Sequence, residues 1–183
     1  MPIPAFDANN VLPPHAGDPR DIGQLSPYPC TSAEFCLHFA TSPDRIAILY
    51  GYLQFRELLG LGGFISGFQW LDGSFLENIE AESNRAPGDL DIITIYVPTD
   101  AGFNGRVAAT HPILTDHNQI KAAYRMDHYF LDTTRHPILT VELTRYWVGL
   151  FSHRRDGVWK GMLRIDLNTP LDDSNAKATL GLP

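Results

Sequence analysis

The chain has 183 residues, of which 44% are hydrophobic and 19% are charged, and its formal net charge is −7. This length suits one compact domain, and the hydrophobic content excludes a disordered chain. The excess of acidic residues argues against non-specific attraction to nucleic acid over the whole surface, but it leaves room for a local basic patch.

Cysteine content and apolar segments bear on the compartment. Two cysteines, Cys30 and Cys36, are too few for a four-ligand zinc site or a disulfide framework, which fits a reducing cytoplasm. The N-terminus has no basic segment followed by an apolar stretch, so it does not resemble a signal peptide. The most apolar segment, 58–71, is interrupted by glycines and is shorter than the ~20 residues that cross a bilayer. We therefore expect a soluble, cytoplasmic protein without a membrane partner.

Proline content sets the first 30 residues apart. Seven of the 14 prolines lie within the first 29 residues, where they fix φ and remove amide donors. We therefore expect residues 1–30 to form an extended arm, rather than helix or sheet, that wraps the domain or binds a partner.

Two helix starts follow this arm. The segment Thr31-Ser32-Ala33-Glu34 has the spacing of a capping box, which predicts a short helix to about Ala40. Ser42-Pro43-Asp44 is a second start, and apolar residues then recur at helical spacing as far as Gly60.

Strands and helices then alternate. Segments that are rich in β-branched residues or alternate in polarity predict strands at 68–71, 89–97, 125–131 and 158–167. Helical spacing predicts helices at 116–124 and 138–152, polar residues around Pro87-Gly88 predict a loop at 78–88, and residues 168–183 are expected to be a loose tail. The sequence thus predicts an α+β domain at 31–167, with a mixed sheet of about four strands covered by helices.

Two carboxylates stand at the start of the strand expected at 89–97. Side chains alternate along a strand, so Asp89 and Asp91 point to the same face with Cα atoms about 6.6 Å apart. Two crowded acids need a compensating cation, and hard oxygen ligands select Mg²⁺ or Mn²⁺. A two-metal site takes about three carboxylates, so we expect a third acid from a neighbouring strand.

Two residues compete for the place of that third acid. Asp127 lies near the start of the next expected strand among bulky apolar or aromatic residues, and it is the better candidate. Asp132 is five positions further on, so in a regular strand the two side chains face opposite ways and only one joins the site. As a simpler alternative, Asp132 is a turn residue at the end of the strand.

A Gly-Ser pair precedes the acidic strand. Glycine lets the backbone approach a phosphate closely, and the exposed amides and hydroxyl of Gly73-Ser74 can donate to phosphate oxygens. The order of strand, Gly-Ser, loop and acidic strand is the order that brings the phosphates of a nucleoside triphosphate to its metal ions.

These residues resemble the signature of the nucleotidyltransferase superfamily with the DNA polymerase β-type fold. The matching residues are Gly73-Ser74, Asp89-Leu90-Asp91 and Asp127. A closer resemblance, over about residues 13–167, is to an uncharacterised bacterial family of small nucleotidyltransferase-like proteins, and it rests on Trp70–Phe75, Gly88–Asp91, Arg125–Asp127, Phe151–Asp156 and Trp159–Gly161. The resemblance implies Mg²⁺-dependent nucleotide transfer, with the metal on the three acids and the phosphates on the Gly-Ser pair.

The chain departs from the superfamily pattern at two points. Fourteen residues separate Ser74 from Asp89, slightly more than the usual gap, and Phe75-Leu76-Glu77 stands where small toxin–antitoxin nucleotidyltransferases have Arg-Gly. The longer loop either folds over a nucleotide or marks a drift in ATP binding.

Basic residues gather near the C-terminal end of the domain. The cluster consists of His153, Arg154, Arg155, Lys160 and Arg164. It is either an ordinary basic turn that offsets the negative end of a helix, or a source of charge for the site. In the second case Lys160 or Arg154 neutralises the triphosphate during transfer.

We therefore expect an enzyme that moves a nucleoside monophosphate from a nucleoside triphosphate to a hydroxyl acceptor. The acceptor remains open between a protein, an RNA 3′ end and another nucleotide, and the oligomeric state is also open. The alternative is a catalytically silent nucleotide-binding or antitoxin-like module that acts through a partner protein.

Overall fold

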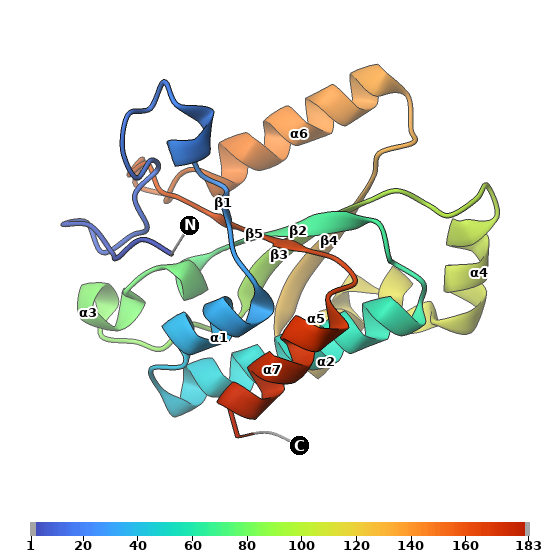
Figure 1. Ribbon diagram of the computed structural model, residues 1–183, viewed down its shortest axis with the longest axis horizontal. Helices are drawn as coiled ribbons and strands as arrows, with labels where there is room; N and C mark the ends of the chain where they lie inside the picture. The colour runs from blue at the N-terminus through green and yellow to red at the C-terminus, as the bar shows by residue number, and fades with distance from the viewer. Residues whose placement is uncertain (1–2, 182–183) are drawn as a thin grey trace.

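A computed structural model describes residues 3–181, which form an α+β structure around one mixed sheet of five strands (Figure 1). The strand order is β1-β5-β2-β3-β4. Strand β2 is antiparallel to both β3 and β5, whereas β4 is parallel to β3 and β1 is parallel to β5. The strands are β1 (Tyr28–Pro29), β2 (Gly67–Asp72), β3 (Leu90–Tyr96), β4 (Met126–Asp132) and β5 (Leu163–Asp166).

Helices cover both faces of this sheet unequally. Figure 1 shows α1, α2, α5 and α7 on one face and α6 on the other, with α3 and α4 at opposite ends. The helices are α1 (Ser32–Phe39), α2 (Pro43–Leu61), α3 (Ile79–Ser83), α4 (Phe103–Thr110), α5 (His117–Tyr124), α6 (Pro137–Phe151) and α7 (Pro170–Thr179). Three short 3-10 helices are η1 (Ile22–Gln24), η2 (Ser74–Leu76) and η3 (Pro112–Thr115). Among the described residues, no helix is long and apolar enough to span a membrane.

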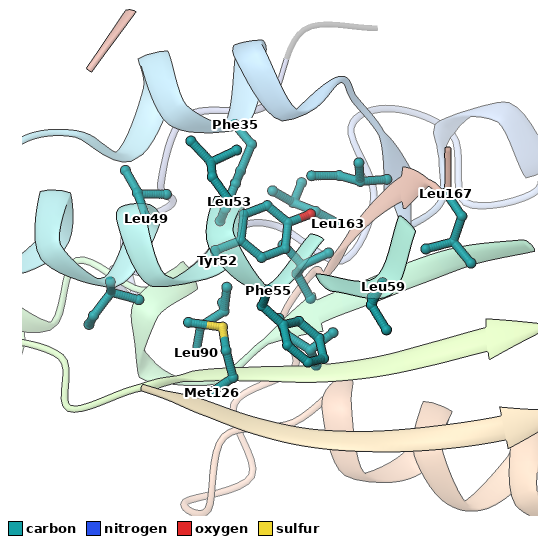
Figure 2. Close-up of a cluster of buried hydrophobic side chains, with 14 of the residues drawn as sticks. Phe35, Leu49, Tyr52, Leu53, Phe55, Leu59, Leu90, Met126, Leu163 and Leu167 are labelled. Atoms are coloured by element: carbon teal, nitrogen blue, oxygen red, sulfur yellow. The ribbon is translucent and has the colours of Figure 1, made fainter. Parts of the chain in front are cut away.

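The two expected helix starts are confirmed. Thr31 accepts a hydrogen bond from the backbone of Glu34, whose side chain caps Thr31 in return, so the capping box opens α1. Ser42 caps α2 and Pro43 occupies its first turn. Apolar side chains of α2 then pack against α1 and the sheet, and Figure 2 shows Leu49, Leu53 and other members of this main core.

The fifth strand corrects the expectation that the N-terminal arm contains no sheet. Tyr28 donates its amide to Met162, and Cys30 donates its amide to Arg164, so β1 adds an edge strand beside β5. Pro29, which lacks an amide donor, is tolerated because an edge strand needs donors on one side only. The arm also wraps the domain, since Leu12 is fully buried. Residues 1–2 of the arm lie outside the described residues.

The C-terminal segment is also more regular than expected. Residues 170–179 form α7 rather than a loose tail, while 182–183 lie outside the described residues. The helix begins at Pro170 and is attached by a 2.7 Å ion pair between Asp173 and the buried Arg56 of α2. Ala176 is fully buried against the core. The apolar surface of this helix is too small for a helical pattern in the sequence to stand out.

Smaller differences lie in the connections. The expected loop at 78–88 contains the short α3, and α4 occupies a region where no element was expected. The last strand is shorter than predicted: it begins at Leu163, whereas 158–162 run as irregular chain with one isolated bridge between His153 and Trp159.

Candidate active site

Three aspartates, one each on β2, β3 and β4, form a row at one end of these strands. In the register of β2 and β3, Asp72 is paired with Asp91, and in the register of β3 and β4, Asp91 is paired with Asp127. Paired residues on neighbouring strands lie on the same face, and strands are about 4.8 Å apart. Asp89, two positions before Asp91, lines the same cleft. We call Asp72, Asp89, Asp91 and Asp127 the acid row.

The glycine after β2 is packed against this row. Gly73 has φ 85° and ψ −175°, a conformation that is almost restricted to glycine. A side chain at this position would collide with the carboxylate of Asp91. Ser74 follows as the first residue of η2 and lines the same cleft. The structure thus brings together the Gly-Ser pair and the three acids that the sequence singled out.

Lys121 from α5 reaches into the open side of the acid row. Its Nζ lies 2.7 Å from Oδ2 of Asp89 and 3.1 Å from Oδ2 of Asp127. The hydrogen bond to Asp89 has the largest effect on the pKa of Lys121, and both contacts raise it. Lys121 is therefore charged at neutral pH. Lys121 was not among the predicted site residues, although its place in the helix just before the Asp127 strand was a clue.

Lys160 lies at the buried side of the row. Its Nζ is 3.0 Å from Oδ1 of Asp72, 2.8 Å from Oε1 of Glu77 and 3.4 Å from the carbonyl oxygen of Gly73. Burial opposes its charge, but Asp72 and Glu77 outweigh that effect and raise its pKa. Burial also raises the pKa of Asp72, to about 7, although Lys160 acts in the opposite direction.

This position corrects the prediction that Lys160 belongs to a strand at 158–167. Because β5 begins only at Leu163, Lys160 belongs to the irregular segment before it and points into the protein. Its ammonium group is held by two carboxylates. The residue therefore supports the turn at Gly73 rather than offering a free charge.

The other basic residues do not form one cluster. Arg154 is paired with Asp156 at 2.7 Å and with Glu82 at 3.5 Å, and it lines the cleft together with His153 and Arg155. Arg164 lies outside the cleft, where it pairs with Asp166 and stacks over Phe68 at 4.3 Å.

Asp132 takes the turn position that was its simpler alternative. It is the last residue of β4 and accepts hydrogen bonds from the backbone and hydroxyl of Thr134, at 2.9 and 2.7 Å, and from Asn104 at 3.0 Å. Asp127 is at the other end of the strand, in register with Asp91. Of the two candidates, only Asp127 belongs to the acid row.

The cleft that contains the acid row has a volume of about 950 Å³. Its walls come from β2 to β4, from the η2–α3 segment and from α6, which contributes aromatic side chains. Burial, together with Asp89 and Asp127, raises the pKa of Asp91 to about 6. Negative charge is therefore concentrated where solvent is limited, and this arrangement favours binding of a cation.

The oxygen atoms of the acid row are of the kind that binds a divalent cation. Oδ1 of Asp127 is buried without a hydrogen-bond partner, and all acid-row ligands are hard oxygens, as Mg²⁺ and Mn²⁺ prefer. Within residues 3–181, however, no three Asp, Glu, His or Cys side chains already converge as a metal-binding group. The ligands fit the cation in kind, and Lys121 supplies the positive charge between Asp89 and Asp127.

Comparison with known proteins identifies a family. Residues 4–166 match the model of a family of unknown function, DUF6932. The chain belongs to this family. Neither the curated proteins nor the solved structures gave a match. The family region covers the whole sheet and the acid row, and it ends before α7.

Proposed function

We propose that this member of DUF6932 is a nucleotidyltransferase that moves a nucleoside monophosphate from a nucleoside triphosphate to a hydroxyl acceptor. The observation that carries the proposal is the paired register of Asp91 and Asp127, with Gly73 packed against Asp91 and Asp89 beside it. A phosphate chain laid over Gly73-Ser74 has its reacting phosphorus beside these carboxylates.

Each part of the site has a role in this reaction. The absence of a side chain at Gly73 leaves room for the carboxylate of Asp91 beside the turn, and the amide and hydroxyl of Ser74 donate to the phosphate oxygens. Asp89, Asp91 and Asp127 would hold Mg²⁺ or Mn²⁺. Such an ion neutralises charge on the triphosphate and lowers the barrier to phosphoryl transfer. Lys160 fixes the carbonyl group of Gly73 and so keeps the turn in place.

The transfer itself is a substitution at the α-phosphorus. The acceptor hydroxyl oxygen forms the new P–O bond, the bond between the α-phosphorus and its bridging oxygen breaks, and pyrophosphate leaves. The hydroxyl proton passes to a carboxylate of the acid row or to solvent. A protein hydroxyl, an RNA 3′ end and a second nucleotide all provide the required acceptor group.

The proposal is tested with each of the four α-labelled nucleoside triphosphates and Mg²⁺, with transfer of label and release of pyrophosphate as the readouts. We expect Asp91→Asn and Asp127→Asn to abolish both, because each removes an acid-row ligand. Asp132→Asn, on the same strand as Asp127 but outside the cleft, is the matched control and retains activity. Label transfer by both acid-row variants at the wild-type level would contradict the mechanism.

One observation favours a second candidate function. Lys121 bridges Asp89 and Asp127, and in a catalytically silent nucleotide-binding or antitoxin-like module this ammonium group would stand permanently in place of a cation. Such a module would gain thermal stability from a nucleoside triphosphate but release no pyrophosphate, with or without a partner protein. Lys121→Met would not restore transfer in that case.

A further inference from the structure

An aromatic strip runs along the cleft wall beside the acid row. It consists of Tyr129 from β4 and Tyr146 and Trp147 from α6. The ring centroids of Tyr129 and Trp147 are 4.8 Å apart, and those of Tyr146 and Trp147 are 5.1 Å apart. All three line the same cleft as Gly73. The strip is therefore part of the cavity that contains the acids.

Within this strip, one ring is buried and two are open. Trp147 is 8% exposed, whereas Tyr129 is 42% and Tyr146 is 54% exposed. Tyr146 and Trp147 form a T-shaped pair with an interplanar angle of 78°, which leaves ring faces uncovered. Trp147 is held from behind by Phe151, 5.4 Å away. The open tyrosines thus stand on a packed support, so little ordering is needed before a planar ligand binds.

The distance along β4 suits a nucleotide. Tyr129 follows Asp127 by two residues, so both side chains lie on the same face with Cα atoms about 6.6 Å apart. A ligand whose phosphates lie at the acid row has only a sugar between those phosphates and its base. Tyr129 therefore lies within reach of that base, and its ring, like those of Tyr146 and Trp147, carries no formal charge.

We propose that Tyr146 and Tyr129, supported by Trp147, bind the base of the nucleotide by stacking. This inference rests on the proposed function, since it assigns the base-binding part of the same cleft. Stacking on aromatic side chains accepts every base because each has a π-face. The strip therefore contributes affinity for nucleotides over bare polyphosphates, and purines, with the larger ring system, bind more tightly than pyrimidines.

The test compares ATP with inorganic tripolyphosphate, which has the phosphates but no base, by calorimetric titration of the full chain in Mg²⁺. We expect the wild-type protein to bind ATP about 5- to 150-fold more tightly than tripolyphosphate, the range expected for one stacked base. Tyr146→Ala lowers the affinity for ATP towards that for tripolyphosphate and leaves tripolyphosphate binding unchanged. Tyr146→Phe keeps the ring and retains ATP binding.

Val148→Ala is the matched control, because Val148 is an exposed apolar residue of α6 that is absent from the cleft lining. It should leave both affinities unchanged. Equal wild-type affinities for ATP and tripolyphosphate would overturn the stacking proposal and leave the proposed function standing. Unchanged ATP binding in a Tyr129→Ala, Tyr146→Ala double variant would also overturn the stacking proposal. It would indicate that the strip binds the acceptor instead of the base. Failure of both ligands to bind would overturn the proposed function itself.

Discussion

Two lysines flank the acid row, and each lies between two carboxylates. Lys160, Asp72 and Glu77 have side chains that are only 5%, 6% and 5% exposed. Lys121, Asp89 and Asp127 have side chains that are 45%, 28% and 23% exposed. The same combination of charges therefore occurs once as a buried cluster and once as an open cluster. We use these two names below.

Because the two clusters differ in burial, they differ in how easily their ion pairs are broken. A buried ion pair that loses one partner leaves an uncompensated charge in a medium that cannot solvate it. An exposed pair is readily replaced by water or by ions. The buried cluster therefore holds the turn at Gly73 in place, whereas the ion pairs of Lys121 in the open cluster are exposed to water and are easily broken.

The largest effect is expected when the buried cluster is broken. Lys160→Met should reduce the free energy of unfolding by about 3–5 kcal/mol, because Asp72 and Glu77 then remain buried without a cation. Urea denaturation measures the change. Adding Glu77→Gln to this variant removes one of the orphaned charges and should recover part of the loss. An unchanged urea midpoint for Lys160→Met would contradict the support role.

The next effect concerns the turn that this cluster supports. Gly73→Ala should cost about 1–3 kcal/mol for the unfavourable backbone conformation, with a further loss from the collision with Asp91. Gly88→Ala is the matched control, since Gly88 also lines the cleft but a side chain there meets nothing within 4 Å. Equal stability of the two variants in thermal denaturation would count against a close contact at Gly73.

Asp91 lies between the two clusters, paired with Asp72 on one side and Asp127 on the other, and it makes the stability of the protein depend on pH. Its pKa is raised to about 6 in the folded protein, so the folded state binds more protons than the unfolded state between about pH 4 and pH 6. Stability contributed by this group therefore falls as pH rises through that range. Asp91→Asn should be about 1–2 kcal/mol more stable than wild type at pH 8 in the presence of a chelator, allowing for the partial exposure of Asp91.

This difference should vanish below about pH 3, where Asp91 is protonated in both states. Asp166→Asn, which removes an exposed carboxylate on β5 outside the cleft, is the control for loss of a charge away from the acid row. A gain in stability for Asp91→Asn that is constant from pH 4 to pH 8 would rule out charge as its cause.

The smallest effect on stability is expected in the open cluster. Lys121→Met should change the free energy of unfolding by less than about 1 kcal/mol, because its ion pairs are exposed to water. The same substitution should increase the affinity for Mn²⁺, measured by the loss of the free-ion signal in electron paramagnetic resonance, because no ammonium then competes for Asp89 and Asp127. Weaker Mn²⁺ binding would mean that Lys121 assists the cation instead of replacing it.

The sequence was most informative where a local pattern coincided with packing. The capping box at Thr31 and the Pro43 start each contain their own hydrogen-bonding or backbone preference, so α1 and α2 were predicted correctly. The β-branched segment of β3 was predicted for the same reason, and its period of two placed Asp89 and Asp91 on one face. The nucleotide chemistry inferred from these residues stays a prediction.

Features that depend on distant partners were missed. Asp72 falls outside the strand predicted at 68–71, and only the antiparallel register of β2 and β3 pairs it with Asp91. Strand β1 exists because the end of the arm meets β5, and α7 is fixed by an ion pair to Arg56. Lys160 was misplaced because the irregular chain before β5 was taken for strand. In each case the deciding contact joins residues far apart in sequence.

Strand β5, between β1 and β2 in the sheet, is the last strand of the sheet to be synthesised. Strands β2, β3 and β4 leave the ribosome before Lys160 and β5, which complete the sheet on the side of β1. Until then, Asp72 and Glu77 have no cation, and β2 has a free edge. Contacts between distant segments form slowly because a long loop must close first. The second strand partner of β2 and the cation that pairs with Asp72 and Glu77 are therefore synthesised only in the last quarter of the chain. A nascent protein has no complete cleft before its synthesis is nearly finished.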